Sequence, residues 1–385
     1  MNPVDQKQNV LVVDDAPANI QAVHSILKDV YKVRVATSGA RALELAKAAP
    51  LPDLILLDVV MPGMDGYEVC TQLKVDPETR DIPVIFLTGQ TETEDETRGF
   101  DVGAVDYIHK PFSPAVVKAR VQTHLMLRGM RQQLALQLNA IQKELETARA
   151  IQFSILPHKI PKITDLDIAA RYIPMSAVAG DFYDFLVIDK QHLGILVADV
   201  SGHGMPAALI ASMLKIALAA QVAHAADPAQ VLTGLNLALC GKFQQHYITA
   251  AYVYLDMEKR ILSYAGAGHP PLLLWNGSSA GVRDVLENGL FLGKFEIATY
   301  TSIQMPVPTN EWILLYTDGI PEAMNPSEVE FGERRFREFL ATERCSSADQ
   351  LADRLLGTLS EWSARGPNPD FDDDLTLVAI RVLGD

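Results

Sequence analysis

The sequence contains few cysteines and no long hydrophobic run. Its three cysteines are scattered at Cys70, Cys240 and Cys345 and lack the close spacing of a disulfide framework or a zinc site. We therefore expect reduced thiols, which are typical of a cytoplasmic protein. No run of about 18 apolar residues occurs, and the opening segment MNPVDQKQNV lacks the apolar stretch of a signal peptide. The sequence predicts a cytoplasmic protein that does not bind a membrane.

Basic residues are scarce relative to acidic ones. The chain has 33 lysines and arginines against 48 aspartates and glutamates, a formal net charge of -15. So little positive potential is unsuited to neutralising a phosphate backbone, and no helix-turn-helix candidate or basic reading helix is apparent. We therefore predict no direct binding to nucleic acid. A length of 385 residues is enough for two domains that each bury a core.

Residues 9–127 alternate short apolar runs with amphipathic helical patterns. This alternation is typical of parallel strands joined by right-handed helical crossovers. It predicts an α/β domain with a five-stranded parallel sheet, preceded by a flexible N-terminus over residues 1–8. The expected strands are Val10–Val13, Val33–Ala36, Leu54–Leu57, Val84–Leu87 and Val105–Ile108.

Acidic residues stand at the ends of two predicted strands. Asp14 and Asp15 end the first strand, and Asp58 ends the third. Because the site of such a sheet lies at the carboxyl ends of its strands, we expect these carboxylates to meet. Asp58 is a candidate acceptor of a phosphoryl group, and Asp14, Asp15, Asp58 and the Val60 carbonyl are candidate ligands of Mg²⁺, which prefers oxygen donors. The alternative, that these acids are ordinary solvated loop residues, leaves their clustering unexplained.

Thr88 and Lys110 end the fourth and fifth predicted strands, where a hydroxyl and an ammonium group would face phosphoryl oxygens. The segments VLVVDD, LILLDVVMPGMDGYE, FLTG and YIHKPF together resemble the receiver domain of two-component response regulators over residues 9–127. The resemblance implies a flavodoxin-like fold and a sensor histidine kinase or phosphotransfer protein as partner. It also implies that Thr88 and Tyr107 form a switch pair, with Lys110 beside them. The alternative for Tyr107 is a half-buried strand aromatic.

Residues 128–157 form the predicted join. The last helix of the first domain continues without a proline until Pro157, and five apolar residues repeat at alternating steps of four and three, which is typical of a coiled-coil seam. We therefore predict a helical coiled-coil linker and a homodimer. The alternative is a single amphipathic helix packed on the second domain of its own chain. The seam residues are Leu134, Leu138, Ile141, Leu145 and Ala148.

The same helix has a basic first half. No acid occurs between Ala115 and Lys143, and two interpretations of the basic residues remain open, a solvated face and docking against acids of the first domain. The basic residues are Lys118, Arg120, Arg128 and Arg131.

Residues 158–385 show strands in series, separated by helical segments. The strand patterns include DIAARYIP, DFYDFLVID, HLGILVADVS, TAAYVYLD, ILSYAGAGHP and WILLYTDG. Helices are expected over Ala207–Ala223, Pro228–Phe243, Phe336–Leu340 and Ala348–Ser363. This order predicts an α+β domain in which two antiparallel sheets form a sandwich with flanking helices.

Four aspartates of this region are candidate metal ligands. Three of them terminate or follow predicted strands, so they can converge at one end of the sandwich. They suit two divalent ions such as Mg²⁺ or Mn²⁺, which take oxygen ligands and activate a bridging water. In this interpretation Asp199 bridges both ions and is the central catalytic residue. Asp181 and the Val200 carbonyl hold one ion, and Asp318 and Asp373 hold the other.

Other polar residues near these acids have two interpretations each. Asp184 lies three residues after Asp181 and is either a further ligand or a structural acid. Asp374 is expected to support Asp373, although the register could differ by one residue. His203 is either a general acid or a loop-stabilising residue, and His269 is expected to be structural.

These segments resemble the PPM family of metal-dependent serine/threonine phosphatases, in its SpoIIE-like branch. The resemblance covers about residues 147–385 through TARAIQFSILP, AGDFYD, DVSGHG, AGHPPLLL, TDGIPEA and DDDLTL. It implies hydrolysis of phosphoserine or phosphothreonine on a protein, often an antagonist of an anti-sigma factor. The competing hypothesis is a phosphorylation-controlled adaptor that binds a sigma factor and has a weak or inactive phosphatase domain. Retention of all four acids favours the enzyme. Carboxylates that are packed together repel one another, and a site that had lost its function would have no reason to keep them.

Overall fold

The computed structural model describes residues 7–89, 98–243, 245–276, 281–364 and 371–384. Most of the predicted flexible segment 1–8 lies outside these residues. The chain divides into two compact units, Met1–Ile141 and Gln142–Asp385, which are described separately. Among the described residues, no helix combines the length and the apolar character that a membrane span requires.

The first unit contains a five-stranded parallel sheet with the strand order β2-β1-β3-β4-β5. The predicted α/β fold is confirmed, and each predicted strand lies within one residue of an observed one. The strands are β1 (Asn9–Val13), β2 (Lys32–Ala36), β3 (Leu54–Asp58), β4 (Val84–Thr88) and β5 (Asp106–His109). The first three helices are α1 (Pro17–Leu27), α2 (Gly39–Lys47) and α3 (Gly66–Val75).

Both faces of this sheet are buried. Along β1, Leu11 and Val13 belong to the apolar core on one face, whereas Val10 and Val12 belong to the core on the other. A strand that is covered on both sides needs apolar residues at every position, which explains why these strands appear as continuous apolar runs in the sequence.

Helix α5 (Pro114–Ile155) is a single helix of 42 residues. Its first part packs on the sheet through Val117, Val121 and Leu125. Two of its basic residues also contact acids of the same unit. Arg120 pairs with Asp106, and Arg128 Nη1 lies 3.8 Å from Asp53 Oδ1. The docking interpretation of the basic residues therefore holds for these two arginines.

The predicted seam of α5 is largely exposed. Leu134, Leu138 and Ile141 keep 57%, 58% and 53% of their surface, whereas Leu145 and Ala148 are half-buried. Exposed leucine and isoleucine at this spacing form an apolar stripe of the kind that a second helix covers in a coiled coil.

The second unit is a sandwich of two sheets, as predicted. One sheet has the order β13-β10-β9-β8-β7, with β14 also paired to β10, and the other has the order β12-β11-β15-β16-β6. All pairs in both sheets are antiparallel except β10 with β13. The first sheet comprises β7 (Phe182–Val187), β8 (His192–Val200), β9 (Ile248–Asp256), β10 (Ile261–Ala267), β13 (Asn288–Gly289) and β14 (Ile303–Pro306). The second comprises β6 (Leu166–Ile173), β11 (Leu272–Trp275), β12 (Arg283–Val285), β15 (Trp312–Tyr316) and β16 (Leu375–Val382).

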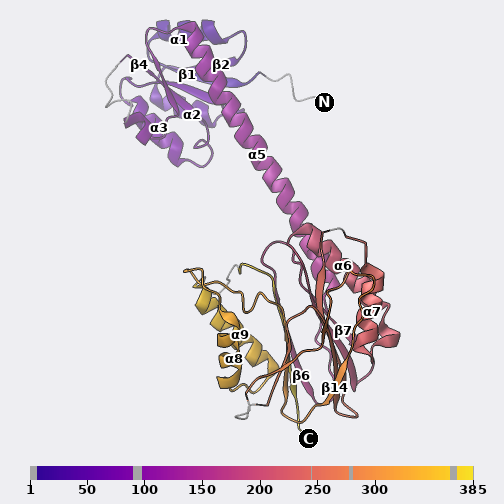
Figure 1. The fold of residues 1–385 in the computed structure, drawn as a ribbon. Helices are drawn as coiled ribbons and strands as arrows, with labels where there is room; N and C mark the ends of the chain where they lie inside the picture. Colours follow the sequence, from indigo (N-terminus) through magenta and orange to yellow (C-terminus); the bar gives the residue numbers. More distant parts are fainter. Residues whose placement is uncertain (1–6, 90–97, 244, 277–280, 365–370, 385) are drawn as a thin grey trace. The chain divides into compact units, whose positions relative to one another are not determined.

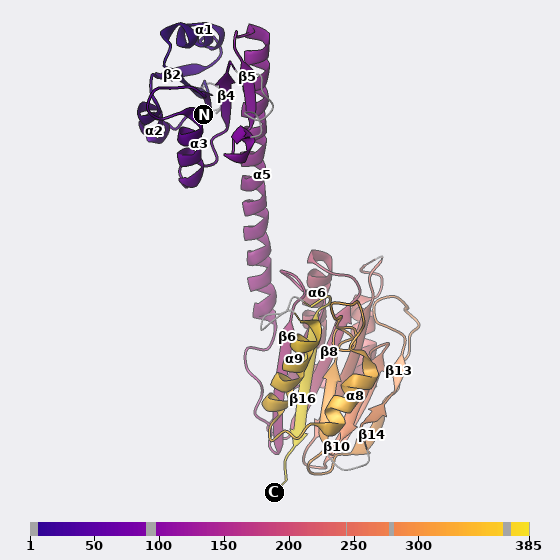
Figure 2. The same ribbon diagram turned by 90° about the vertical axis from the view of Figure 1, so that its left-hand side faces the viewer.

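Helices cover the outer faces of this sandwich. Helices α6 and α7 lie on one side and α8 and α9 on the other (Figure 1), and Figure 2 shows α8 and α9 in front of the sheets. One apolar core lies between the sheets and extends to α6 and α7, and another joins the second sheet to α8 and α9. The helices are α6 (Met205–Ala219), α7 (Pro228–Leu239), α8 (Gly332–Thr342) and α9 (Ala348–Ser363), and a short 3-10 helix spans Val222–His224.

Candidate functional site

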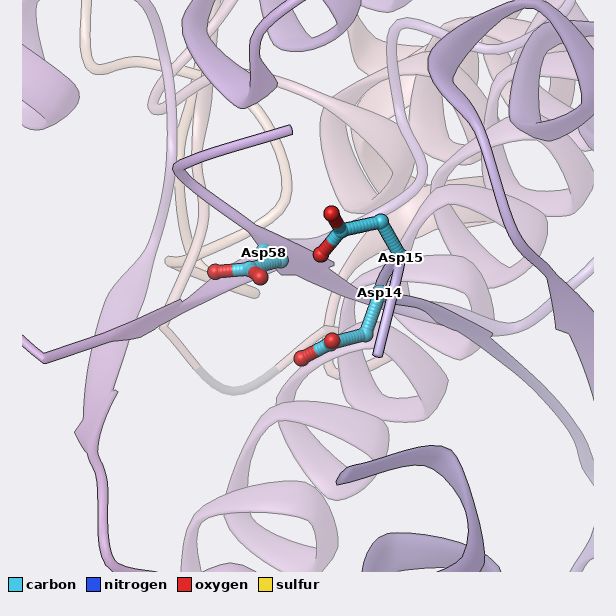
Figure 3. A group of neighbouring side chains, drawn as sticks. All are labelled: Asp14, Asp15 and Asp58. Carbon is cyan, nitrogen blue, oxygen red and sulfur yellow. The ribbon is translucent and has the colours of Figure 1, made fainter. Parts of the chain in front are cut away.

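Three aspartates meet at the carboxyl edge of the parallel sheet. Asp14 and Asp15 directly follow β1, and Asp58 is the last residue of β3. Figure 3 shows the three carboxyl groups turned toward a common space, and each places an oxygen within 4.8 Å of the others. Asp14 and Asp58 are buried, whereas Asp15 is exposed. This donor set suits a hard divalent cation that keeps several water ligands on its open side.

Lys110 lies against this cluster. Its Nζ is 2.8 Å from Asp14 Oδ2 and 2.8 Å from Asp58 Oδ2. Burial raises the pKa of Asp58, and the hydrogen bond from Lys110 opposes that rise. The lysine is therefore placed to balance negative charge that accumulates at Asp58.

The turn after β3 brings the chain close to Asp58. A Cβ at Gly66 would lie 2.2 Å from the Asp58 carbonyl oxygen, so only glycine fits there. Helix α3 starts at this glycine, and its capping box joins Asp65 and Glu68. Sequence analysis did not assign a role to Gly66, although the segment MDGYE contains the capping pattern.

Three other residues that the sequence predicted for this site are Thr88, Val60 and Tyr107. Thr88 ends β4 and is buried, and Val60 follows Asp58 closely enough for a backbone hydrogen bond to the Asp58 carboxylate. Tyr107 is buried, and its ring centroid lies 5.6 Å from that of Phe86 and 5.2 Å from that of Phe100. The phenol group therefore lies in an inward position.

The four aspartates of the second unit lie at one end of the sandwich. Asp199 is the next-to-last residue of β8, followed by Val200, and Asp181 immediately precedes β7, which pairs with β8. Asp318 lies two residues after β15, and Asp373 lies two residues before β16, which pairs with β15. Antiparallel pairing thus places the end of β8 beside the start of β7, and the end of β15 beside the start of β16.

Electrostatics shows that these carboxylates interact. Burial and the negative charges of Asp318 and Asp373 raise the pKa of Asp199 to about 8. Burial and the charge of Asp199 likewise raise the pKa of Asp181. Within the described residues, no three of these acids have oxygens as close to one another as those of Asp14, Asp15 and Asp58. The wider spacing suits ions that keep several waters as ligands.

Two threonines hold the Asp181 side chain. Its Oδ2 accepts hydrogen bonds from Thr317 Oγ1 at 2.8 Å and from Thr376 Oγ1 at 2.5 Å. Both hydroxyl groups are buried, so they fix the orientation of this carboxylate. Sequence analysis missed them, although each lies within three residues of a predicted acid.

Asp374 and Asp184 have structural contacts. Asp374 Oδ1 accepts from the Met175 N–H at 2.8 Å, and its Oδ2 accepts from the Gly180 N–H at 2.6 Å. These bonds show that Asp374 holds the segment before Asp181, whereas its expected support of Asp373 stays a prediction. Asp184 Oδ2 lies 2.7 Å from Lys215 Nζ, which favours its structural interpretation.

The end of α5 contacts the same loop through Gln152. The buried side chain donates from Nε2 to the Ala179 carbonyl at 2.6 Å and accepts from the Ala179 N–H at 3.0 Å. Ala179 precedes Gly180 and Asp181, so the linker helix directly fixes the segment that carries a candidate ligand. Sequence analysis noted this stretch of helix but not this residue.

Glu322 is a further carboxylate that sequence analysis missed. Its N–H donates to the Asp318 carbonyl at 2.9 Å. Burial and the charges of Asp318 and Asp373 raise the pKa of Glu322, and its own charge contributes to the raised pKa of Asp199. The spacing of four residues after Asp318 is the signal that could have identified it.

The histidines differ in their surroundings. His203 is exposed and makes no hydrogen bond with the described residues, so the structure offers no contact for a loop-stabilising role. His269 is buried, its Nδ1 lies 2.9 Å from Thr249 Oγ1, and burial lowers its pKa to about 3, which agrees with a structural role. His246, which sequence analysis did not single out, places Nδ1 2.6 Å from the Ser201 carbonyl and so holds the loop after Asp199.

Comparison with known families gives two matches that together cover most of the chain. Residues 10–122 match the model of the response regulator receiver domain. Residues 189–383 match the model of the stage II sporulation protein E, SpoIIE.

Relatives and solved structures agree with this division. The chain is 33% identical to the phosphoserine phosphatase RsbU of Bacillus subtilis over 264 residues, which are 68% of this chain and 74% of RsbU. It is 52% identical to a probable cyclic di-GMP phosphodiesterase of Vibrio cholerae over 116 residues, which are 30% of this chain and 26% of that protein. The PP2C domain of SiaA from Pseudomonas aeruginosa superposes with a TM-score of 0.56 and 25% identity, over 64% of this chain and 99% of that domain.

Proposed function

Because the chain belongs to the SpoIIE family of protein phosphatases and carries a response regulator receiver domain, we propose that it is a phosphatase that removes phosphate from serine or threonine of a protein under the control of phosphorylation at Asp58. The matches confirm the predicted family and the predicted enzyme class, a serine/threonine phosphatase.

The observation that carries the proposal is the meeting of acids from separate segments at one end of the sandwich. Burial, together with repulsion between neighbouring carboxylates, raises the pKa of Asp199, Asp318 and Asp181. Folding has therefore placed like charges together at a cost, which is typical of a site built for cations. The donor set consists of carboxylates, which are the ligands that Mg²⁺ and Mn²⁺ prefer.

Each acid has a distinct role in the proposal. Asp199 would contribute to both of two Mg²⁺ or Mn²⁺ sites, with Asp181 and the Val200 carbonyl completing one and Asp318 and Asp373 completing the other. Bound ions of this kind lower the pKa of a water and stabilise charge on a phosphoryl group. Thr317 and Thr376 keep Asp181 in the orientation that binding needs.

In the receiver unit we propose that Asp58 accepts the phosphoryl group. Asp14, Asp15, Asp58 and the Val60 carbonyl hold Mg²⁺, and Lys110 attracts the phosphoryl oxygens. In the proposed switch, Thr88 and Tyr107 respond to phosphorylation of Asp58.

The partners follow from the two units. We propose that a sensor histidine kinase or phosphotransfer protein supplies the phosphoryl group. The substrate is a phosphoprotein of the anti-sigma-factor antagonist class in a sigma-factor signalling pathway, and the protein acts in the cytoplasm. The working boundaries are 9–127 for the receiver, 128–157 for the linker and 158–385 for the phosphatase, with dimerisation through the apolar stripe of α5.

Hydrolysis assays with the full-length protein test this proposal. Turnover of p-nitrophenyl phosphate and of phosphorylated antagonist proteins should require Mn²⁺ or Mg²⁺ and stop with chelator. Asp199→Ala should lower turnover by about 10³-fold, because transition-state charge stabilisation is lost. Acetyl phosphate should label the wild-type receiver but not Asp58→Ala. Metal-independent turnover would refute the assigned chemistry, and a complete lack of activity would leave the sigma-factor adaptor as the replacement.

A further inference from the structure

A basic pocket lies in the first unit, at the amino-terminal edge of its sheet. Its volume is about 630 Å³, which is within the range of small-molecule sites. Helix α5 forms one wall, and the loop between α3 and β4 forms another. The lining residues are Lys74, Arg80, Asp81, Pro83, Val105, His124, Leu127, Arg128, Arg131, Gln132 and Ala135.

This pocket is separate from the Asp58 site. Asp58 is the last residue of β3, at the carboxyl edge, whereas Pro83 and Val105 directly precede β4 and β5 at the opposite edge. The proposed phosphorylation chemistry therefore does not account for it.

Positive charge dominates the lining although the chain as a whole is acidic. Lys74, Arg80, Arg128 and Arg131 are basic, and Asp81 is the one carboxylate of the lining. Asp81 is 91% exposed and its Oδ2 is 4.0 Å from Arg80 Nε, so it does little to neutralise the pocket.

Several of these cations have unused hydrogen-bonding capacity. Lys74 Nζ donates to the carbonyls of Arg80 and Ile82, at 3.0 and 2.7 Å, which leaves one proton and the whole charge available. The Arg128 Nε–H is buried and has no acceptor in the described part of the chain. Arg131 forms no ion pair with a described residue and is exposed. Arg128 Nη1 contacts the Pro52 carbonyl at 2.9 Å and lies 3.8 Å from Asp53 Oδ1, so its Nε–H is the group left for a ligand. Four like charges gathered around one pocket, with donors still unused, favour an anionic ligand.

The remaining lining residues indicate what else the ligand carries. Pro83, Val105, Leu127 and Ala135 offer an apolar wall, and the Gln132 amide can both donate and accept hydrogen bonds. Guanidinium groups match phosphate oxygens in a planar fork, and an apolar wall suits a flat ring. We propose that this pocket binds a nucleoside phosphate, with the phosphate toward the arginines and the base toward the apolar wall.

Fluorescence anisotropy of N-methylanthraniloyl-ADP with the full-length protein tests this inference. EDTA is present throughout, so that neither acidic site can retain the nucleotide through a metal ion. We expect saturable binding that unlabelled ADP reverses and that weakens as salt is raised. Arg80→Glu should weaken binding by about tenfold or more, because a charge-assisted contact is replaced by repulsion.

Matched variants separate the pocket from general charge effects. Lys118→Glu is an equal charge reversal at an exposed residue of α5 outside the pocket, and it should leave the affinity unchanged. Arg131→Glu is a second test on a different element from Arg80, and urea unfolding checks that each variant is folded. Absence of saturable binding to the wild type would overturn the proposal. So would wild-type affinity in both Arg80→Glu and Arg131→Glu when the two variants are folded. Displacement of the probe by polyglutamate or pyrophosphate but not by ADP would also overturn it, since the ligand would then be a simple polyanion or an acidic protein segment.

Discussion

Replacing Gln152 tests how the linker helix contributes to the phosphatase site. The Gln152→Ala variant removes both hydrogen bonds to Ala179 and leaves a buried N–H and a buried carbonyl without partners. Each unsatisfied buried group costs about 1–3 kcal/mol, so the free energy of unfolding should fall by about 2–4 kcal/mol once water partly fills the gap.

Loss of this contact should also affect catalysis. The released loop contains Gly180, whose N–H binds Asp374, and then Asp181. Misplacing the Asp181 carboxylate, a proposed metal ligand, by about 1 Å would weaken metal binding and alignment, so we expect turnover to fall by about 10²-fold. Excess Mn²⁺ should recover part of the lost activity, which a purely structural defect would not show.

Two measurements on the full-length protein check this prediction. Urea unfolding gives the change in stability, and hydrolysis of p-nitrophenyl phosphate over a range of Mn²⁺ concentrations gives turnover and apparent metal affinity. Gln137→Ala is the matched control, because Gln137 is an exposed glutamine of the same helix. If Gln152→Ala keeps both the stability and the Mn²⁺ dependence of the wild type, the linker does not position the Asp181 loop.

Three further perturbations address other features of the chain. Gly66→Ala should destabilise the receiver and strongly reduce labelling by acetyl phosphate, because its Cβ would lie 2.2 Å from the Asp58 carbonyl oxygen, and normal labelling would contradict that close approach. In metal-free protein the raised pKa of Asp199 stabilises the folded state at low pH, and this contribution should be lost as pH rises toward about 8. Asp199→Asn should therefore flatten the decline in the urea midpoint between pH 5 and pH 8, a range in which an unfolded aspartate is ionised while folded Asp199 still holds its proton. We expect phosphorylation at Asp58 to raise turnover through the seam, so the double variant Leu138→Glu, Leu145→Glu should sediment as a monomer and lose stimulation by acetyl phosphate while keeping basal hydrolysis. Full stimulation in the monomer would exclude the seam as the route of control.

The receiver site could be predicted from sequence because its geometry follows from local pattern. In a parallel sheet every strand ends at the same edge, so residues that follow Val13 and Leu57 must be neighbours once the strands are recognised. The structure places Asp14 and Asp58 there, each 2.8 Å from Lys110 Nζ. Residue type and strand position were sufficient, and no knowledge of side-chain contacts was needed.

The second unit shows the limit of that reasoning. Its fold class and its four acids could be predicted from strands in series and from motifs around each aspartate. The strands β11 to β14 and β16 were not identified, because short or continuous apolar runs in an antiparallel sandwich have weak periodicity. The partner of each acid also depends on which strands pair.

The sequence by itself therefore determined the strands of the first unit, the family and the acids available for chemistry. Only the tertiary structure decided that Thr317 and Thr376 hold Asp181, that Lys215 neutralises Asp184, and that Gln152 reaches Ala179. It also formed the basic pocket, whose residues come from α3, two strand entrances and α5. These contacts join residues far apart in the chain, and a hydrogen bond depends on ångström-scale distances that side-chain packing sets and local sequence pattern does not.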